Sequence, residues 1–223
     1  MTKPETDLEG VAPLPRGRHG LPPEEVATHQ RERIVAAICR VVAEQGFGAL
    51  TVERVLALAG VSRSTFYVHF ANKREAVVAA HEVVFGRFLA GVESACSLEA
   101  EWPLKIRSAI VATIDFATSR PEQTQILMTG SLSADAVLAE RIIASHNRLA
   151  RLLEGARADS PYADHLPDCT GQFLVAGVAS FVASCLAGDE ADRLRSVQSE
   201  LVELTLIPYY GNEAAAKFAR QPG

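Results

Sequence analysis

The sequence LTVERVLALAGVSRSTFYVHFANK, residues 50–73, decides the fold of the N-terminal part of this chain. Thr51 and Ser62 are of the residue types that cap helices, and apolar side chains follow each of them at helical spacing. Gly60 stands between the two segments, where a tight turn is needed. The pattern predicts a short helix over 52–59, a turn and a second helix over 63–70. This is a helix-turn-helix, whose second helix lies in the major groove of DNA.

The second helix of this motif carries side chains suited to DNA. Arg63, Ser64 and Thr65 stand at its N-terminus, from which they can reach base edges or phosphates. Tyr67 and His69 carry polar tips suited to phosphate oxygens. Taken one at a time, these residues are equally compatible with an ordinary amphipathic helix surface, so the assignment depends on the motif as a whole.

The helical pattern continues on both sides of the motif. Apolar residues at spacings of three and four predict helices over 24–45 and 73–94, the second capped by Asn72. Further helices are expected over 103–119, 122–131, 135–157, 168–187 and 190–209. The fold class is therefore all-α, with about nine helices: an N-terminal three-helix helix-turn-helix head and a larger C-terminal helical bundle.

Three regions follow from this pattern. Residues 1–23 contain five prolines and three glycines and are expected to form a flexible basic arm. Residues 24–75 are expected to form the helix-turn-helix DNA-binding domain, and residues 76–223 a ligand-binding and dimerisation domain. In the arm, Arg16, Arg18 and His19 are candidates for insertion into a minor groove, the alternative being a tail that only aids solubility.

The charge of the chain is unevenly distributed. The whole chain has 22 basic and 27 acidic side chains, a net charge of −5, which by itself argues against nucleic-acid binding. Residues 16–74, however, hold nine basic and five acidic side chains, and residues 75–223 carry a net charge of −7. Electrostatics should therefore attract DNA to the head and repel it from the remainder.

Composition also argues against several other classes of protein. The four cysteines lie far apart, which favours reduced thiols in the cytoplasm over a disulfide framework or a metal site. No apolar signal segment is visible at the N-terminus. The uncharged stretch 169–188 is long enough to span a membrane, but its small and polar residues favour a buried helix of a soluble bundle. We find no metalloprotease, nucleophile-elbow or phosphate-loop motif, so no enzyme activity, metal or cofactor is expected.

The run AGVSRSTFYVHFANKREAV, which starts at Ala59, resembles the signature of the tetracycline-repressor (TetR) family of transcriptional regulators. The one departure is a valine, Val77 or Val78, where the family usually has leucine. The resemblance implies a homodimer formed through the last two helices, a palindromic DNA operator, and a small molecule that weakens DNA binding. The DNA contacts that it implies are Thr51, Ser62, Arg63, Ser64, Thr65, Tyr67, His69 and Lys73.

The larger domain offers candidates for effector binding and for dimerisation. His146 is the polar anchor that we consider for an apolar or amphipathic effector, although core packing explains most of the set without any ligand. The pocket candidates are Trp102, Ile106, Ile110, Phe116, Met128, His146, Leu149 and Phe173. The dimer candidates are Gly171, Ala176, Gly177, Ser180 and Ala183, with Leu201, Leu204, Thr205 and Tyr209, intrachain packing being the alternative.

The function expected from the sequence is that of a ligand-responsive, cytoplasmic DNA-binding regulator, most simply a repressor. Two alternatives stay open. One is an architectural DNA-binding protein that uses the same head without an effector. The other is a helical enzyme with an unrecognised site.

Overall fold

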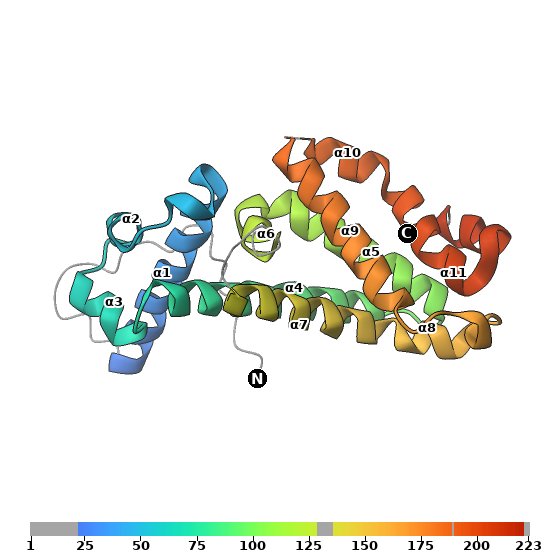
Figure 1. Cartoon of the computed structure of the whole chain (residues 1–223), viewed down its shortest axis with the longest axis horizontal. Helices are drawn as coiled ribbons and strands as arrows, with labels where there is room; N and C mark the ends of the chain where they lie inside the picture. Colours follow the sequence, from blue (N-terminus) through green and yellow to red (C-terminus); the bar gives the residue numbers. More distant parts are fainter. Residues whose placement is uncertain (1–21, 129–135, 189, 221–223) are drawn as a thin grey trace. The chain divides into compact units, whose positions relative to one another are not determined.

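The computed structural model describes residues 22–128, 136–188 and 190–220, and the regular structure in these ranges is helical (Figure 1). The expected all-α fold is therefore confirmed. The described α-helices are α1 (Pro23–Gln45), α2 (Val52–Ala59), α3 (Arg63–His69), α4 (Lys73–Ser97), α5 (Trp102–Ser119), α6 (Pro121–Met128), α7 (Ala136–Leu152), α8 (Glu154–Asp159), α9 (Thr170–Ala187), α10 (Ala191–Ser196) and α11 (Gln198–Ala219). The interpretation of the arm, with Arg16, Arg18 and His19, lies outside the described residues.

The chain divides into two compact units, one ending at Val83 and the other beginning at Val84. The division falls inside α4, whereas the sequence placed the domain boundary after residue 75, in the first turn of that helix. In the N-terminal unit, α2 and α3 both pack against α1. The apolar stripe of α1 is buried as its spacing predicts, with Ile34, Ile38 and Val41 at most 1% exposed.

Local capping defines the ends of the two short helices in the head. The hydroxyl of Thr51 accepts a hydrogen bond from the backbone N–H of Arg54 at 3.3 Å, and that of Ser62 accepts one from Thr65 at 3.0 Å. Gly60 ends α2 in the left-handed region, with φ of +60°. A side chain there would be strained, so this glycine fixes the turn of the helix-turn-helix.

The start of α4 carries the reciprocal cap that its sequence predicts. The side-chain oxygen of Asn72 accepts a hydrogen bond from the backbone N–H of Glu75 at 3.0 Å. The carboxylate of Glu75 reaches back and accepts one from the N–H of Ala71 at 2.8 Å. Two backbone donors that a helix start leaves open are thereby satisfied, and the turn after α3 is held in place.

The C-terminal unit has its own apolar core, in which α5 packs against α11. The core is built from aliphatic side chains of α5, α9, α10 and α11, with a few alanines and one buried tyrosine. Its buried members are Ile106, Ile110, Ile114, Ala117, Ala156, Val182, Cys185, Leu194, Leu201, Val202, Leu206, Tyr209, Ala215 and Ala219.

Two of the expected helical segments are each divided in two, which raises the number of α-helices in the described ranges to eleven. Segment 135–157 becomes α7 and α8, and segment 190–209 becomes α10 and α11. At the first division, Trp102 packs directly against Gly155: a Cβ at this glycine would lie 1.7 Å from Cζ2 of the indole. The sequence marks Gly155 as a breaker but gives no sign that an indole occupies the space beside it.

The last helix also extends beyond the segment 190–209. α11 continues to Ala219 across a kink at Gly211, which has φ of +76°. The hydroxyl of Ser160 donates a hydrogen bond to the backbone oxygen of Tyr209, close to this kink. This contact compensates for the helical hydrogen bonding that the kink disturbs.

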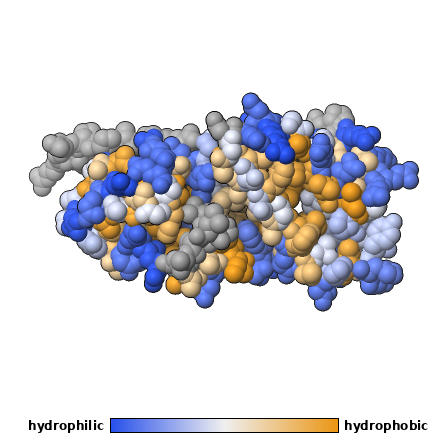
Figure 2. Space-filling view, turned by 45° about the horizontal axis from the view of Figure 1, so that its top comes forward, coloured by the Kyte–Doolittle hydropathy of each residue, from blue (hydrophilic) through white to orange (hydrophobic). Residues whose placement is uncertain are grey.

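The uncharged helix α9 is half-buried or exposed along most of its length, which corrects the expectation of a buried helix. Its mean hydropathy over 18 residues is 1.6, but only Val182 and Cys185 are buried. Phe173, a pocket candidate, is 76% exposed on its surface. Hydrophobic side chains do remain at the surface of the C-terminal unit in the view of Figure 2. Length and composition alone would allow α9 to cross a membrane.

Candidate DNA-binding site and effector region

The N-terminus of α3 gathers four of the expected DNA contacts. The hydroxyl of Ser62 caps the helix and also lies 2.8 Å from the hydroxyls of Ser64 and of Thr65. Ser62, Arg63 and Ser64 are exposed, and Thr65 is half-buried. Backbone N–H groups and short hydroxyl side chains at a helix N-terminus favour an anion such as a phosphate.

The rest of α3 has one buried face and one exposed face. Phe66 and Phe70 are 1% and 2% exposed, with ring centroids 5.7 Å apart, and they fix the helix to the head. On the other face, Tyr67 is 47% exposed and Val68 is 79% exposed. Sequence reasoning missed Val68, although its position one turn after Ser64 indicates the exposed face.

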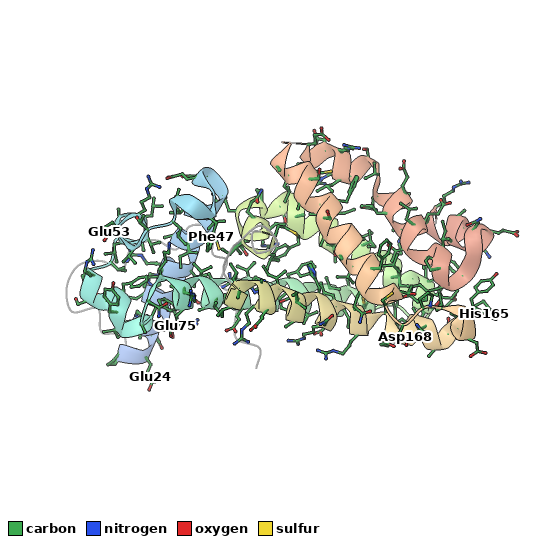
Figure 3. The ribbon with its side chains drawn as sticks, in the orientation of Figure 1. Glu24, Phe47, Glu53, Glu75, His165 and Asp168 are labelled. Carbon is green, nitrogen blue, oxygen red and sulfur yellow. The ribbon has the colours of Figure 1, made fainter. Side chains whose placement is uncertain are left out.

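Arg63 of α3 forms an ion pair with Glu53 of α2. Figure 3 labels Glu53. Both side chains are more than half exposed. A hydrogen bond from its own backbone N–H and one from Arg63 hold the pKa of the Glu53 carboxyl below its usual range. The guanidinium is therefore positioned at the protein surface before any ligand arrives. The sequence gives no signal for this pair, because the two residues lie on different helices.

The last two expected DNA contacts bond to other parts of the head. Nε2 of His69 lies 3.2 Å from Oε1 of Gln30 on α1, and burial together with the charge of Arg31 lowers the pKa of this histidine. Nζ of Lys73 donates a hydrogen bond to the backbone oxygen of Leu50, just before α2, at 3.0 Å. Both side chains thus help to hold the helices of the head together.

The charge of the described head is balanced, which sharpens the electrostatic expectation. Residues 22–83 contain seven basic and seven acidic side chains. Residues 16–74 have an excess of positive charge because that range includes Arg16 and Arg18 and ends before Glu75 and Glu82. Attraction of DNA to the head itself must come from the arrangement of its charges rather than from their sum.

The structure brings four of the eight effector candidates to one core and places the other four elsewhere. Ile106 and Ile110 of α5 are buried in the core of the C-terminal unit, and Trp102 and Met128 pack against it. The ring of Phe116 makes an edge contact with Phe88, at 5.3 Å between centroids. His146 and Leu149, both on α7, are half-buried, and Phe173 lies at the surface. Burial lowers the pKa of His146, which favours the neutral imidazole at neutral pH.

One buried polar residue of the C-terminal unit was missed. Gln123, near the start of α6, is 3% exposed, and neither atom of its amide group has a hydrogen-bond partner in the described structure. Its position after Pro121 gave no sign of burial, because a polar residue in the first turn of a helix is ordinarily exposed.

The fold and the capped, exposed α3 define a helix-turn-helix protein of the DNA-binding class. Residues 34–80 match the family model of the bacterial regulatory proteins of the tetR family. The uncharacterized HTH-type transcriptional regulator YerO of Bacillus subtilis (strain 168) is 33% identical over 57 residues, 26% of this chain. That match spans a fifth (20%) of the length of YerO.

Solved structures extend the likeness to most of the chain. The fatty acid degradation regulator FadR of Bacillus halodurans superimposes with a TM-score of 0.71 at 18% identity, over 79% of this chain and 94% of that one. FadR of Bacillus subtilis in complex with stearoyl-CoA superimposes with a TM-score of 0.68 at 17% identity, over 78% of this chain and 96% of that one. A TetR family regulator of Marinobacter aquaeolei VT8 superimposes with a TM-score of 0.63 at 17% identity, over 81% of this chain and 96% of that one. Residues 34–80 thus match the tetR family model, and the fold of most of the chain is similar to that of TetR family regulators.

Proposed function

We propose that this chain is a transcriptional repressor that binds a palindromic operator as a homodimer and releases it when a small apolar or amphipathic molecule binds. The observation that carries this proposal is the N-terminus of α3, where Ser62, Arg63 and Ser64 are exposed on a helix anchored by buried Phe66. A rigid helix with short polar and cationic side chains at its exposed N-terminus is what reading of the major groove requires.

Within this proposal the contacts divide by chemistry. Arg63 and Ser64 discriminate among base pairs, and exposed Val68 is placed to contact a thymine methyl group. The other contacts bind the sugar-phosphate backbone and set the register, without reading sequence. They are Thr51, Ser62, Thr65, Tyr67, His69 and Lys73.

The exposed face of α9 supports a dimer. Phe173, Ala176, Ser180 and Ser184 recur at spacings of three and four and are all exposed, as is neighbouring Gly177, so a second helix could approach closely. On α11, Leu204 is 61% exposed. The other α11 candidates, Leu201, Thr205 and Tyr209, are buried in the core of their own chain and are not available to a partner. We therefore assign the interface to α9 and the exposed edge of α11.

The proposed effector is a long-chain acyl-CoA or a molecule like it. Support comes from the likeness in fold to the FadR structure in complex with stearoyl-CoA. The aliphatic interior of the C-terminal unit, to which Ile106, Ile110 and Met128 contribute, is compatible with an acyl chain. As a soluble regulator of this kind, the chain acts in the cytoplasm and is not an enzyme.

The test begins with selection of DNA duplexes from a random library by the intact chain. We expect an enriched palindrome, bound tightly in fluorescence anisotropy and released by stearoyl-CoA. A coupling of about 1–3 kcal/mol would weaken operator binding roughly 5- to 150-fold. Failure to enrich any sequence overturns operator binding. Enrichment without release by any acyl-CoA overturns this effector class and supports an architectural DNA-binding protein.

A further inference from the structure

We propose that Gln123 of α6 is the polar anchor of the effector and that it binds a neutral hydrogen-bonding group, such as an amide or a thioester. The inference rests on the proposed function, since it concerns the molecule that releases DNA. It deepens that function by naming the chemical group that the interior of the C-terminal unit selects.

The position of Gln123 is interior. Its side chain is 3% exposed, and it shares one side of α6 with Ile126 and Leu127, which are 0% and 8% exposed. Residues at i, i+3 and i+4 lie on the same face of a helix. The amide group therefore projects with aliphatic side chains rather than into bulk water, and α6 packs against α5 and α9 of the same unit.

The hydrogen bonding of Gln123 sets it apart from other buried polar residues of the C-terminal unit. The hydroxyls of Thr124, Ser145 and Thr205 each donate to the backbone carbonyl four residues earlier, at 2.7–3.0 Å. Oε1 and Nε2 of Gln123 have no partner among the described residues. A buried donor or acceptor without a partner destabilises a fold, so the unliganded fold would be more stable with an apolar residue here. A ligand that satisfies the amide accounts for the glutamine.

The chemistry of the site selects an uncharged group. A carboxamide offers one acceptor and two donors but no charge. Among the described residues of the C-terminal unit, no Asp, Glu, Lys or Arg is buried. A carboxylate placed beside Gln123 would therefore find no fully buried counter-ion, which is unfavourable. A thioester or amide carbonyl accepts a hydrogen bond from Nε2, and an amide N–H donates to Oε1. The inference therefore favours acyl thioesters over free fatty acids.

The experiment compares the intact wild-type chain with Gln123→Met, which keeps the side-chain volume and removes the amide. Thr124→Val is the matched control, because Thr124 is equally buried but bonds to its own helix. Binding of stearoyl-CoA and of stearate is measured by isothermal titration calorimetry, and melting temperature by circular dichroism without ligand. We expect Q123M to melt at the same or a higher temperature and to bind stearoyl-CoA on the order of tenfold more weakly. T124V should bind it as wild type does, and wild type should prefer stearoyl-CoA to stearate.

Four results would overturn the inference, and they separate it from the proposed function. If Q123M binds stearoyl-CoA as tightly as wild type does, Gln123 is not the anchor, but the proposed effector class stands. A lower melting temperature of Q123M without ligand gives Gln123 a structural role instead. Equal wild-type affinity for stearate and stearoyl-CoA contradicts the preference for a neutral group. A wild-type chain that binds no stearoyl-CoA overturns the proposed effector class itself.

Discussion

Glu53 of α2 holds the guanidinium of Arg63, the first residue of α3, in an ion pair at the surface of the head. The pair couples the two helices of the motif and places a negative charge beside the cation that we assign to base recognition. In a DNA complex this carboxylate repels phosphate and limits the geometries that Arg63 can adopt.

Replacing Glu53 with Gln should therefore relax specificity. Arg63 is released and one negative charge is lost, so affinity for duplexes of unrelated sequence should rise several-fold while operator affinity changes less. If Arg63 then contacts a phosphate, the salt dependence of non-specific binding steepens by about one charge. Fluorescence anisotropy on operator and scrambled duplexes at several salt concentrations measures both effects. Glu44→Gln is the control, because Glu44 forms an exposed ion pair with Arg40 on α1. Equal effects of both substitutions would contradict a specific role for Glu53.

Substituting Lys73 with Ala should have two separable effects. Loss of a phosphate contact weakens binding to every duplex and lowers the salt slope by about one. Loss of the hydrogen bond to the backbone oxygen of Leu50 destabilises the head by about 0.5–1.5 kcal/mol. Fluorescence anisotropy measures the DNA affinity and its salt dependence, and urea unfolding measures the stability. Arg74→Ala removes the neighbouring charge and spares the bond to Leu50. Operator binding that is unchanged in both Lys73→Ala and Tyr67→Ala would refute the assignment of the DNA contacts.

Much of the head could be predicted because local interactions build it. Caps such as Thr51 and Ser62 act within three residues, and Gly60 is needed for a positive φ, so short stretches of sequence specify the helix ends. The apolar spacing of α1 likewise predicts its buried face. The ion pair of Arg63 with Glu53 escaped prediction, because side chains on separate helices meet only through the packing of those helices.

The C-terminal unit could be predicted only as a set of helices. Hydrophobicity alone cannot separate an apolar residue that packs inside the chain from one that faces outward. Tyr209 was expected at an interface and is buried, whereas Phe173 was expected in a pocket and is exposed. Gln123 was not singled out from the sequence at all, although its polar side chain lies inside the C-terminal unit. Each case depends on contacts between distant segments, which helical periodicity does not contain.

Gly155→Ala should destabilise the C-terminal unit. Alanine ordinarily stabilises a helix relative to glycine by up to about 1 kcal/mol, but here a Cβ would lie 1.7 Å from the indole of Trp102. Overpacking of this kind costs about 1–3 kcal/mol, so the net effect should be a lower melting temperature. Gly91→Ala on α4, where a Cβ meets no atom within 4 Å, should raise the melting temperature instead. Equal behaviour of the two variants by calorimetry would disprove close packing at Trp102.

Phe173→Lys should dissociate the proposed dimer. A charge buried in this helix interface cannot be neutralised without a partner, so the variant should sediment as a monomer and lose most operator affinity. Leu98→Lys is the control, because Leu98 is similarly exposed at 84% but follows the end of α4 and belongs to neither α9 nor α11. Sedimentation velocity at micromolar concentration distinguishes monomer from dimer for both variants. A dimer that persists in Phe173→Lys and dissociates in Leu98→Lys would move the interface to another surface.

The contact of Trp102 with Gly155 also provides a built-in optical reporter. Trp102 is the single tryptophan of the chain and lies in the C-terminal unit, whereas the N-terminal unit contains tyrosine only at Tyr67. Indole emission therefore reports on one unit alone, without any label. The order in which the two units respond to denaturant can thus be followed by comparing indole emission with helix content. Binding of a small molecule near the indole would likewise change the wavelength or the intensity of the indole emission.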